Sequence, residues 1–225
     1  LIPNLLAELD GTTRIPVKIS VARVNAGVRG IQNLSKLGAA TVSSITDIPN
    51  QAAELRYQGI HVMKGYGNAL IEGIKSAKTK YCCIINADGS MDPKYLKKMY
   101  ALCEQKDLIF TSRYQKPNGG SQDDDIVTFI GNKFFSLFGN LFFKLNISDI
   151  LFTYILGKTK SFRKMKLSRH DFRICVELPI KAKRLKLNYI CIPSFERARI
   201  GGKKKVNALK DGFLILTEMI RLLFK

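Results

Sequence analysis

The sequence predicts an α/β domain whose central sheet is mostly parallel. From residue 59 onward, strand-like runs alternate with helical patterns of roughly 10 to 15 residues, and the apolar run at residues 81–87 stops abruptly at acids and a glycine. The chain has 225 residues, 46% of them hydrophobic, which suffices for one sizeable core but not for two full domains. We therefore expect one domain over residues 1–205, followed by a basic, amphipathic helix over residues 206–225.

The first regular elements lie between residues 59 and 105. Residues 59–65 (GIHVMKG) are typical of a short strand, 68–77 (NALIEGIKSA) of a helix and 81–87 (YCCIINA) of a buried strand. Residues 92–105 predict a helix with Pro93 in its first turn, where proline is well tolerated.

The second half continues the alternation. Residues 107–114 (DLIFTSRY) predict a strand, and the glycines and acids of 116–125 (KPNGGSQDDD) predict a loop. A helix follows at 128–146, and we expect most of its six phenylalanines to face the core. Residues 188–195 (NYICIPSF) predict one more strand, and an apolar-rich helix closes the chain at about 208–224.

The region before residue 59 is ambiguous. Residues 1–9 (LIPNLLAEL) have a helical pattern, while 17–24 (VKISVARV) and 39–48 (AATVSSITDI) are compatible with strands. The order of elements in this region stays open.

Charge is concentrated in the last third of the chain. The formal net charge is +19, and residues 158–225 hold 19 of the 37 Lys and Arg but only 5 of the 18 Asp and Glu. This basic segment favours an anionic partner, which could be nucleic acid, phospholipid or a phosphorylated substrate. Nucleic acid is disfavoured because the chain has no Trp, no aromatic residues interleaved with the basic run, and no recognised nucleic-acid-binding motif.

The cysteines indicate a reducing, cytoplasmic environment. There are five, an odd number, and none is spaced as C-x-x-C. Neither a disulfide framework nor a zinc site is favoured.

The strand end at residues 86–90 is the first candidate site. Side chains two apart in an extended segment point the same way, so Asn86, Asp88 and Ser90 could converge on one ion. Oxygen ligands of this kind suit Mg²⁺ or Mn²⁺, with substrate phosphates completing the shell. The alternative is an acidic turn in which Asp92 or Ser90 caps the helix that begins near Pro93.

Two glycine-containing segments are further candidates. The pair Gly65 and Gly67 could receive a phosphate at the start of a helix, although close packing between backbone segments explains it equally well. Residues 199–205 (RIGGKKK) place cations around paired glycines, as a loop that closes over a pyrophosphate requires. A solvated or membrane-facing surface is the alternative for this run.

Several spaced motifs, taken together and in this order, resemble the family 2 inverting glycosyltransferases. The resemblance is strongest to the subgroup of dolichyl-phosphate mannose synthase-like and bacterial surface-polysaccharide enzymes. It implies a Rossmann-like nucleotide-sugar-binding domain of the GT-A type. The motifs are residues 65–77, 84–93, 111–114, Ser148 with Asp149, Glu177, and residues 199–212.

The resemblance assigns a metal-binding role to the strand end. The D-x-D element of the family falls on Asn86 and Asp88, with Ser90 as a further contact, and Asp88 would bind a Mg²⁺ or Mn²⁺ ion that bridges the diphosphate. Asparagine in place of the first acid removes one negative ligand and should weaken metal binding.

The basic loop is implied to hold the donor diphosphate. The family's Arg-x-x-Gly-x-Ser-Lys pattern falls on Arg199, Gly202, Lys204 and Lys205, with lysine at position 204 where serine is usual.

Three further residues receive roles near the reacting groups. Arg113 would lie near the donor phosphates or the acceptor, and Gly67, from the glycine pair, could let the nucleotide approach. Asp149 would lie near the sugar and the acceptor, as the candidate base if the acceptor is a hydroxyl. The acidic loop that grips the nucleoside in this family is matched only by residues 42–47 (VSSITD). With the first strand of the family not matched, the chain resembles a fragment or an inactive relative.

The implied reaction is transfer of a sugar, with inversion, from a GDP- or UDP-sugar to a polyprenyl phosphate or glycan acceptor. The main alternative is a catalytically silent domain of the same fold that binds a membrane partner. Residues 211–225 combine large apolar residues with Lys and Arg, as an interfacial helix on an anionic leaflet does. We therefore expect peripheral contact with the cytoplasmic face of a membrane, and the alternative is a helix packed on its own domain.

Overall fold

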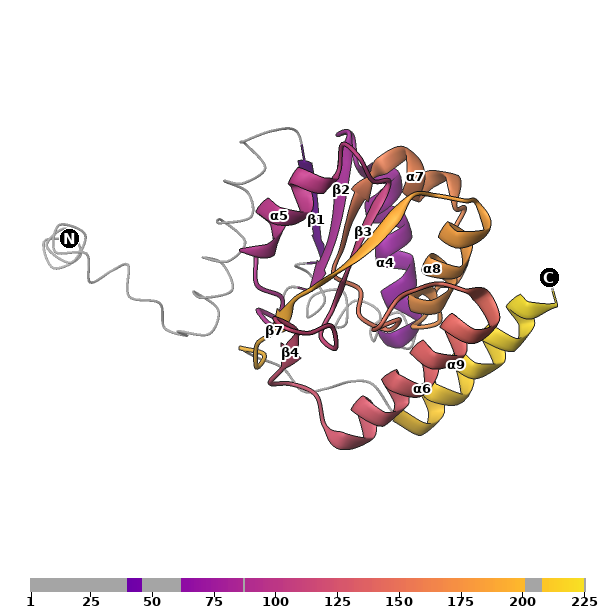
Figure 1. The fold of residues 1–225 in the computed structure, drawn as a ribbon. Helices are drawn as coiled ribbons and strands as arrows, with labels where there is room; N and C mark the ends of the chain where they lie inside the picture. The colour runs from indigo at the N-terminus through magenta and orange to yellow at the C-terminus, as the bar shows by residue number, and fades with distance from the viewer. Residues whose placement is uncertain (1–39, 46–61, 87, 201–207, 225) are drawn as a thin grey trace, which may run out of the picture.

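The computed structural model describes residues 40–45, 62–86, 88–200 and 208–224, which form a sheet covered by helices on both faces (Figure 1). The predictions for residues 1–9 and 17–24 lie outside these ranges. Of the two candidate strands before residue 59, the second is confirmed in part, because residues 40–45 form a strand.

The central sheet has five strands and is mixed. Their spatial order is β1 (Ala40–Ile45), β2 (Tyr81–Asn86), β5 (Ile155–Lys158), β3 (Leu108–Ser112) and β6 (Tyr189–Pro193). β1 pairs parallel with β2, and β3 pairs parallel with β6, while β5 runs antiparallel between the two pairs. The mostly parallel sheet is confirmed, and the carboxyl ends of four strands meet at one edge.

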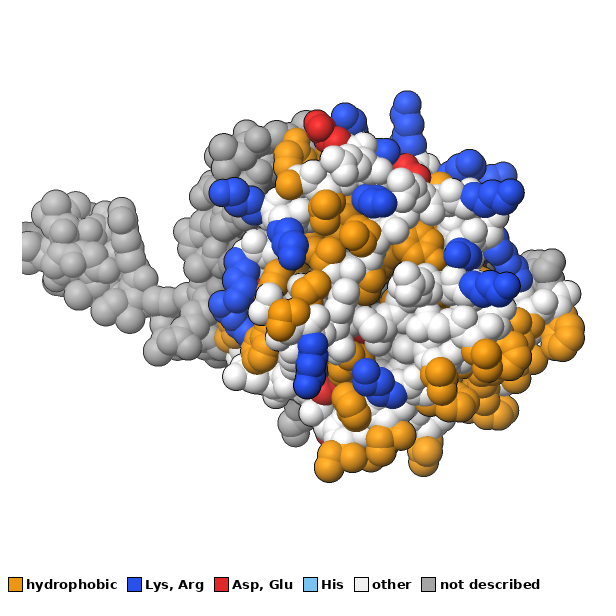
Figure 2. All heavy atoms as spheres, in the orientation of Figure 1, with side chains coloured by type: hydrophobic (Ala, Val, Ile, Leu, Met, Phe, Trp, Pro, Cys, Tyr) orange, Lys and Arg blue, Asp and Glu red, His pale blue; other side chains and the backbone are white. Residues whose placement is uncertain are grey.

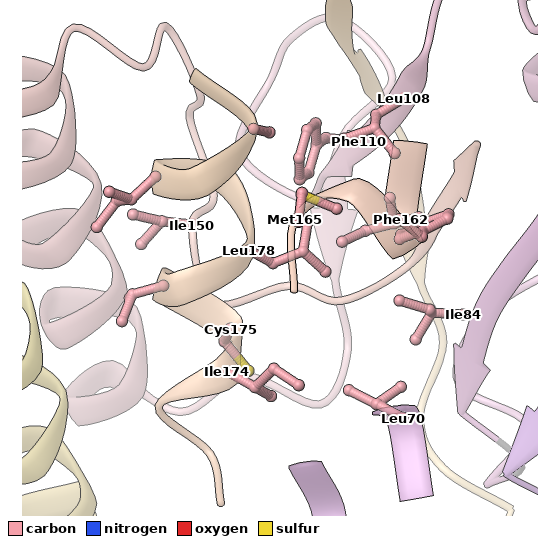
Figure 3. Packing of buried hydrophobic residues seen from close by; sticks show 14 of the residues in the cluster. Leu70, Ile84, Leu108, Phe110, Ile150, Phe162, Met165, Ile174, Cys175 and Leu178 are labelled. Atoms are coloured by element: carbon pink, nitrogen blue, oxygen red, sulfur yellow. The ribbon is translucent and has the colours of Figure 1, made fainter. Parts of the chain in front are cut away.

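Alternate side chains of the strands enter two separate cores, as the pleat requires. In β2, Cys82 and Ile84 belong to one cluster, and Cys83 and Ile85 belong to the other. Figure 3 shows Ile84 on the first face, with residues from the surrounding helices. Burial on both faces explains why this strand is a continuous apolar run.

Four helices make up most of the cover over the two faces. α4 (Val62–Ser76), α7 (Thr159–Lys164) and α8 (Ile174–Arg184) contribute to the first cluster, and α5 (Tyr95–Leu102) contributes to the second. The predicted helix at 92–105 is confirmed in its central part by α5.

Two further helices and a small second sheet complete the described part of the chain. α6 (Ile126–Phe143) packs against α9 (Ala208–Leu223), and both contribute to the first core (Figure 1). β4 (Gly120–Ser121) pairs parallel with β7 (Phe195–Glu196), so the loop after β3 is joined to the chain after β6.

The prediction of a strand at residues 59–65 is wrong, because α4 already begins at Val62. Gly67 therefore lies inside a helix, where its N–H donates to the carbonyl of His170 at 2.9 Å. A Cβ atom at this position would lie 2.2 Å from the carbonyl oxygen of Arg169. The glycine permits a close approach between the helix and the loop at 169–171, which is the packing alternative of the sequence analysis.

Glu177 holds that loop in place. Its fully buried carboxylate accepts hydrogen bonds from the backbone N–H groups of Ser168 and Arg169 at 2.9 to 3.1 Å, and from the Ser168 hydroxyl at 2.7 Å. Lys181 lies 2.7 Å from the same carboxylate. Burial acts to raise the pKa of Glu177, but these donors outweigh it and lower the pKa below the ordinary value.

The expectation that most phenylalanines of α6 face the core holds for half of the six. Phe135 is buried, and Phe138 and Phe143 are partly buried against the first core. The other three, Phe129, Phe134 and Phe142, are 44%, 49% and 52% exposed. The helix was predicted at nearly the right place, but the structure covers one side of it and leaves the other exposed. The remaining apolar side chains form part of the protein surface.

The cysteines are free, and four of the five are buried. Burial raises the pKa of Cys82 and of Cys103 to about 11, so both thiols stay protonated at neutral pH.

Substitution of Gly67 tests the packing against the 169–171 loop. We expect Gly67→Ala to lower the free energy of unfolding by about 2–4 kcal/mol, because backbone atoms must move to admit the methyl group. The matched control is Gly131→Ala in α6, where a Cβ meets nothing within 4 Å. The control should be neutral or stabilising by up to about 1 kcal/mol. Urea unfolding measures both, and equal effects would contradict the assigned contact.

Candidate functional site

Three loops meet at the carboxyl edge of the sheet. They follow β2, β3 and β6. The Arg197 N–H donates to the Ser90 carbonyl at 2.9 Å, the Ile200 N–H donates to the Asp88 carbonyl at 2.9 Å, and the Gly120 N–H donates to the Ser194 carbonyl at 3.4 Å. Segments that are far apart in sequence are thereby fixed side by side.

The strand end predicted to bind metal is an ordered turn. Asp88 accepts hydrogen bonds from the Ser90 N–H at 3.0 Å and the Ser90 hydroxyl at 2.7 Å. Gly89 has a φ of +79°, and a Cβ there would lie 2.4 Å from the side chain of Ile200. The glycine thus gives the turn its left-handed residue and makes room for the chain that follows β6.

The side-chain oxygen atoms at this turn fit a divalent cation whose coordination shell is completed by substrate oxygens. The Asn86 side-chain oxygen is buried and has no hydrogen-bond partner within the described part of the chain, and Asp88 adds one carboxylate. The described residues contain no group of three or more His, Cys, Asp and Glu that could hold a metal. A site of this kind depends on phosphate oxygens, as Mg²⁺ sites often do.

The capping alternative named Asp92 or Ser90, but the N-cap of α5 is Lys94, which has no side-chain cap. Asp92 instead holds the turn that leads into the helix. The Asp92 carboxylate accepts from the Lys94 N–H at 3.0 Å, and its carbonyl accepts from the Tyr95 N–H at 3.3 Å as α5 begins. Asp92 also pairs with Arg197 at 2.6 Å. Two acids four residues apart therefore have different tasks, and the turn at Asp88 is left for another role.

Arg113 stands at the centre of a buried ion cluster just after β3. Its Nε and Nη2 donate to the two oxygens of Asp149 at 2.7 and 3.0 Å, and its Nη1 donates to Glu196 at 3.0 Å. Its backbone N–H also donates to Asp149 at 3.1 Å. Burial alone would lower the pKa of Arg113, but the two acids raise it above its ordinary value.

Glu196 is a residue that the sequence analysis did not single out. It accepts from Arg113 and, at 2.6 Å, from the Ser121 hydroxyl, so it joins β7 to the loop after β3. Burial raises the pKa of Glu196, and the two donors offset this only in part. The available signal was an acid directly after the predicted strand at residues 188–195 and next to Arg197 and Arg199.

Asp149 lies beside Arg113, and its side chain is fully buried. Both carboxylate oxygens already accept hydrogen bonds from Arg113. This geometry suits a residue that orients Arg113, and the pair would have to open before Asp149 could take a proton from an acceptor. Its assignment as a base stays a prediction.

Tyr114 connects the cluster to α6. Its hydroxyl is hydrogen-bonded to Asp124 and accepts from the Asn132 side chain at 3.2 Å. Its ring lies edge-on to Phe129 with centroids 5.2 Å apart, and the Lys133 ammonium is 4.7 Å from the Tyr114 centroid. Burial raises the pKa of Tyr114, so this hydroxyl is protonated at neutral pH.

Arg199 reaches the same edge but is already paired. Its Nε lies 3.0 Å from both oxygens of Asp123, and the side chain is 25% exposed. The other predicted donor-binding residues of this loop, Gly202, Lys204 and Lys205, lie outside the described residues. Gly67 is accounted for by its contact with the 169–171 loop.

Comparison with known proteins identifies the family. The model of glycosyl transferase family 2 matches residues 47–166. The chain belongs to glycosyl transferase family 2. No curated protein sequence matches it. The family predicted from the motifs is therefore confirmed, while the dolichyl-phosphate mannose synthase-like subgroup stays a prediction.

Two solved structures resemble this family 2 chain. Glucosyl-3-phosphoglycerate synthase from Mycobacterium tuberculosis, in complex with uridine diphosphate, aligns with a TM-score of 0.51 and 12% identity, over 82% of this chain and 68% of that one. S. aureus TarS 1-349 aligns with a TM-score of 0.38 and 13% identity, over 82% of this chain and 61% of that one. The first likeness supports the GT-A-like α/β fold.

Replacement of Asp149 tests whether this residue is held by Arg113 in a buried pair or is accessible as a base. We expect Asp149→Asn to lower the free energy of unfolding by about 3–5 kcal/mol, because it removes one partner of a buried charge pair. The control is Glu72→Gln, which breaks the solvent-exposed pair with Lys75 and should cost about 1 kcal/mol or less. Chemical denaturation measures both. A loss below that of the control would show that the Arg113 pair is open in solution.

Proposed function

We propose that this chain transfers a sugar, with inversion, from a UDP- or GDP-sugar to a polyprenyl phosphate or glycan acceptor. The observation that carries the proposal is the convergence of Asn86, Asp88, Arg113 and Arg199 at one edge of the sheet in a family 2 chain. In open α/β sheets, this edge is where ligands bind. The uridine diphosphate bound by the Mycobacterium tuberculosis relative supports the donor class.

Asp88, Asn86 and Ser90 would hold a Mg²⁺ or Mn²⁺ ion. When bound, the ion supplies positive charge to the departing nucleoside diphosphate. The turn is suited to this because Asp88 is already oriented by Ser90 and the buried Asn86 oxygen lacks a partner among the described residues.

Arg199 would stabilise the same diphosphate. The guanidinium forms a two-point contact with Asp123, and planar guanidinium groups bind phosphate in the same way. Lys204 and Lys205 follow it closely in sequence and would add charge. Exchange of Asp123 for a phosphate would keep Arg199 paired.

The geometry around Asp149 favours an acceptor that is already anionic. A hydroxyl acceptor needs a base within hydrogen-bond reach, but both Asp149 oxygens are held by Arg113. A polyprenyl phosphate carries its own nucleophilic oxyanion and needs no such base. Such an acceptor would place the reaction at the cytoplasmic face of a membrane, with the chain attached peripherally.

The second candidate function is a silent domain of the same fold that binds a membrane partner. It is favoured by Asn86, which stands where the family has an acid. A nucleic-acid-binding module has less support, because the residues that converge at the sheet edge support a diphosphate site in a family 2 chain.

Calorimetric titration with UDP and GDP, each with and without Mn²⁺, tests the donor site. We expect one nucleotide to bind in the presence of Mn²⁺, and Asp88→Ala to weaken that binding by roughly tenfold or more, since the substitution removes the carboxylate ligand. The control is Glu104→Ala, which removes an exposed acid beyond α5.

The control should bind as the unmodified chain does. Binding of neither nucleotide would contradict the transferase and favour the silent domain. Equal nucleotide affinity of the Asp88→Ala and Glu104→Ala variants in the presence of Mn²⁺ would indicate that the metal does not bind at the turn after β2.

A further inference from the structure

An apolar surface runs along α6 and α9, which pack side by side (Figure 1). Of the fourteen exposed large hydrophobic residues in the described part of the chain, eight lie in α6 and four in α9 or at Phe224 directly after it. Figure 2 shows the hydrophobic side chains gathered at the lower right, where Figure 1 places these helices. We name these twelve side chains the α6–α9 apolar face. A continuous patch of this kind marks an interaction site.

The opposite side of α6 is fixed to the domain. Ser136 is buried, and its hydroxyl accepts from the Ile150 N–H at 3.1 Å. A Cβ at Gly139 would lie 2.9 Å from Ile150 and 3.0 Å from Leu145. By length and composition α6 is the one described helix that could cross a membrane. In this fold, however, it lies along the domain and presents only one side outward.

The charges on the two helices indicate what covers this face. α6 contains no acid and one cation, the exposed Lys133. The two acids of α9, Asp211 and Glu218, are buried, and Glu218 is paired with Arg169 and Arg221. The exposed Asp125 lies at the α6 N-cap, where it accepts from the Thr128 N–H at 2.7 Å. The exposed charged residues within the two helices are therefore cations.

This distribution disfavours a second copy of the chain as the occupant. A twofold interface places the same surface on both partners, so cations would face cations with no exposed acid from either helix between them. An anionic phospholipid surface offers the opposite charge and an apolar interior.

We propose that the α6–α9 apolar face docks on an anionic phospholipid bilayer. The two helices lie in the interface with their apolar side chains below the headgroups and the cations at headgroup level. The sequence led us to expect this role for residues 211–225 alone. The structure assigns the larger share of exposed apolar side chains to α6.

The docking face leads to the site described above. Phe129 and Lys133, in the first part of α6, lie against Tyr114, which follows the buried Arg113. A bilayer on this face therefore lies beside the loop after β3. If the proposed function holds, a lipid-linked acceptor would enter from the bilayer past Tyr114, with Lys133 next to its phosphate.

Vesicle co-sedimentation of the full chain tests the docking surface. We expect binding to phosphatidylcholine vesicles that contain about 30% phosphatidylglycerol, and weaker binding to pure phosphatidylcholine. The double variant Leu137→Gln/Leu141→Gln replaces side chains that are 68% and 67% exposed, so it should fold normally. It should bind the anionic vesicles at least roughly tenfold more weakly, because two leucine side chains that would insert into the bilayer are lost.

The control is Lys97→Gln/Lys98→Gln, which removes two exposed cations from α5 on the other face of the sheet. It should bind nearly as the unmodified chain does. Failure of the unmodified chain to sediment, or an equal loss in the control, would overturn the proposal. The proposal would also be overturned if the unmodified chain formed a dimer, did not bind vesicles, and became monomeric in the variant Leu137→Gln/Leu141→Gln. The assay contains no nucleotide, so none of these results bears on the donor site, which nucleotide titration of the same double variant tests separately.

Discussion

The bidentate pair between Arg113 and Asp149 is the interaction on which the arrangement of the site depends. It joins the end of β3 to the segment that enters β5, and Glu196 extends it to β7. Charges buried in this way are tolerated only when their partners are complete. The cluster therefore fixes the distance between three chain segments that sequence separates by 36 and 83 residues. The antiparallel β5 is what makes this possible, since its starting end lies at the same edge as the carboxyl ends of β2, β3 and β6.

The strands β2, β3 and β6 and the helices α5, α6 and α9 could be predicted because local pattern and tertiary environment agree there. The run at residues 81–85 is apolar because both faces of the sheet are covered, and Pro93 lies two residues before α5. By contrast, β5, α7 and α8 were not predicted. The prediction failed at Gly67 and for half of the phenylalanines in α6. The local sequence of a glycine pair does not distinguish a phosphate-binding turn from a helix that packs closely against a loop. The packing role is seen only when the backbone of Arg169 is placed next to Gly67. An apolar helix likewise does not reveal how many of its sides the fold covers.

The candidate site, too, could be predicted only in part. Asp88, Arg113 and Arg199 could be found from strand ends and family motifs, whereas their partners could not. Asp123 holds Arg199, Glu196 holds Arg113, and neither pairing is visible in a local pattern, because each spans more than 70 residues. The α6–α9 apolar face lies next to this site. Together they describe a family 2 chain with a proposed diphosphate-binding edge and an adjoining apolar side that is proposed to face lipid.

The central claim is that the turn at Asn86 and Asp88 binds a divalent metal together with the donor diphosphate. The most direct measurement is the affinity for Mn²⁺ in the presence of UDP or GDP, for the unmodified chain and for Asn86→Asp. Water proton relaxation reports the binding of Mn²⁺. A second carboxylate at this turn should tighten Mn²⁺ by roughly tenfold, because it supplies the charge that asparagine lacks. An unchanged Mn²⁺ affinity in Asn86→Asp would contradict the account and place the metal elsewhere.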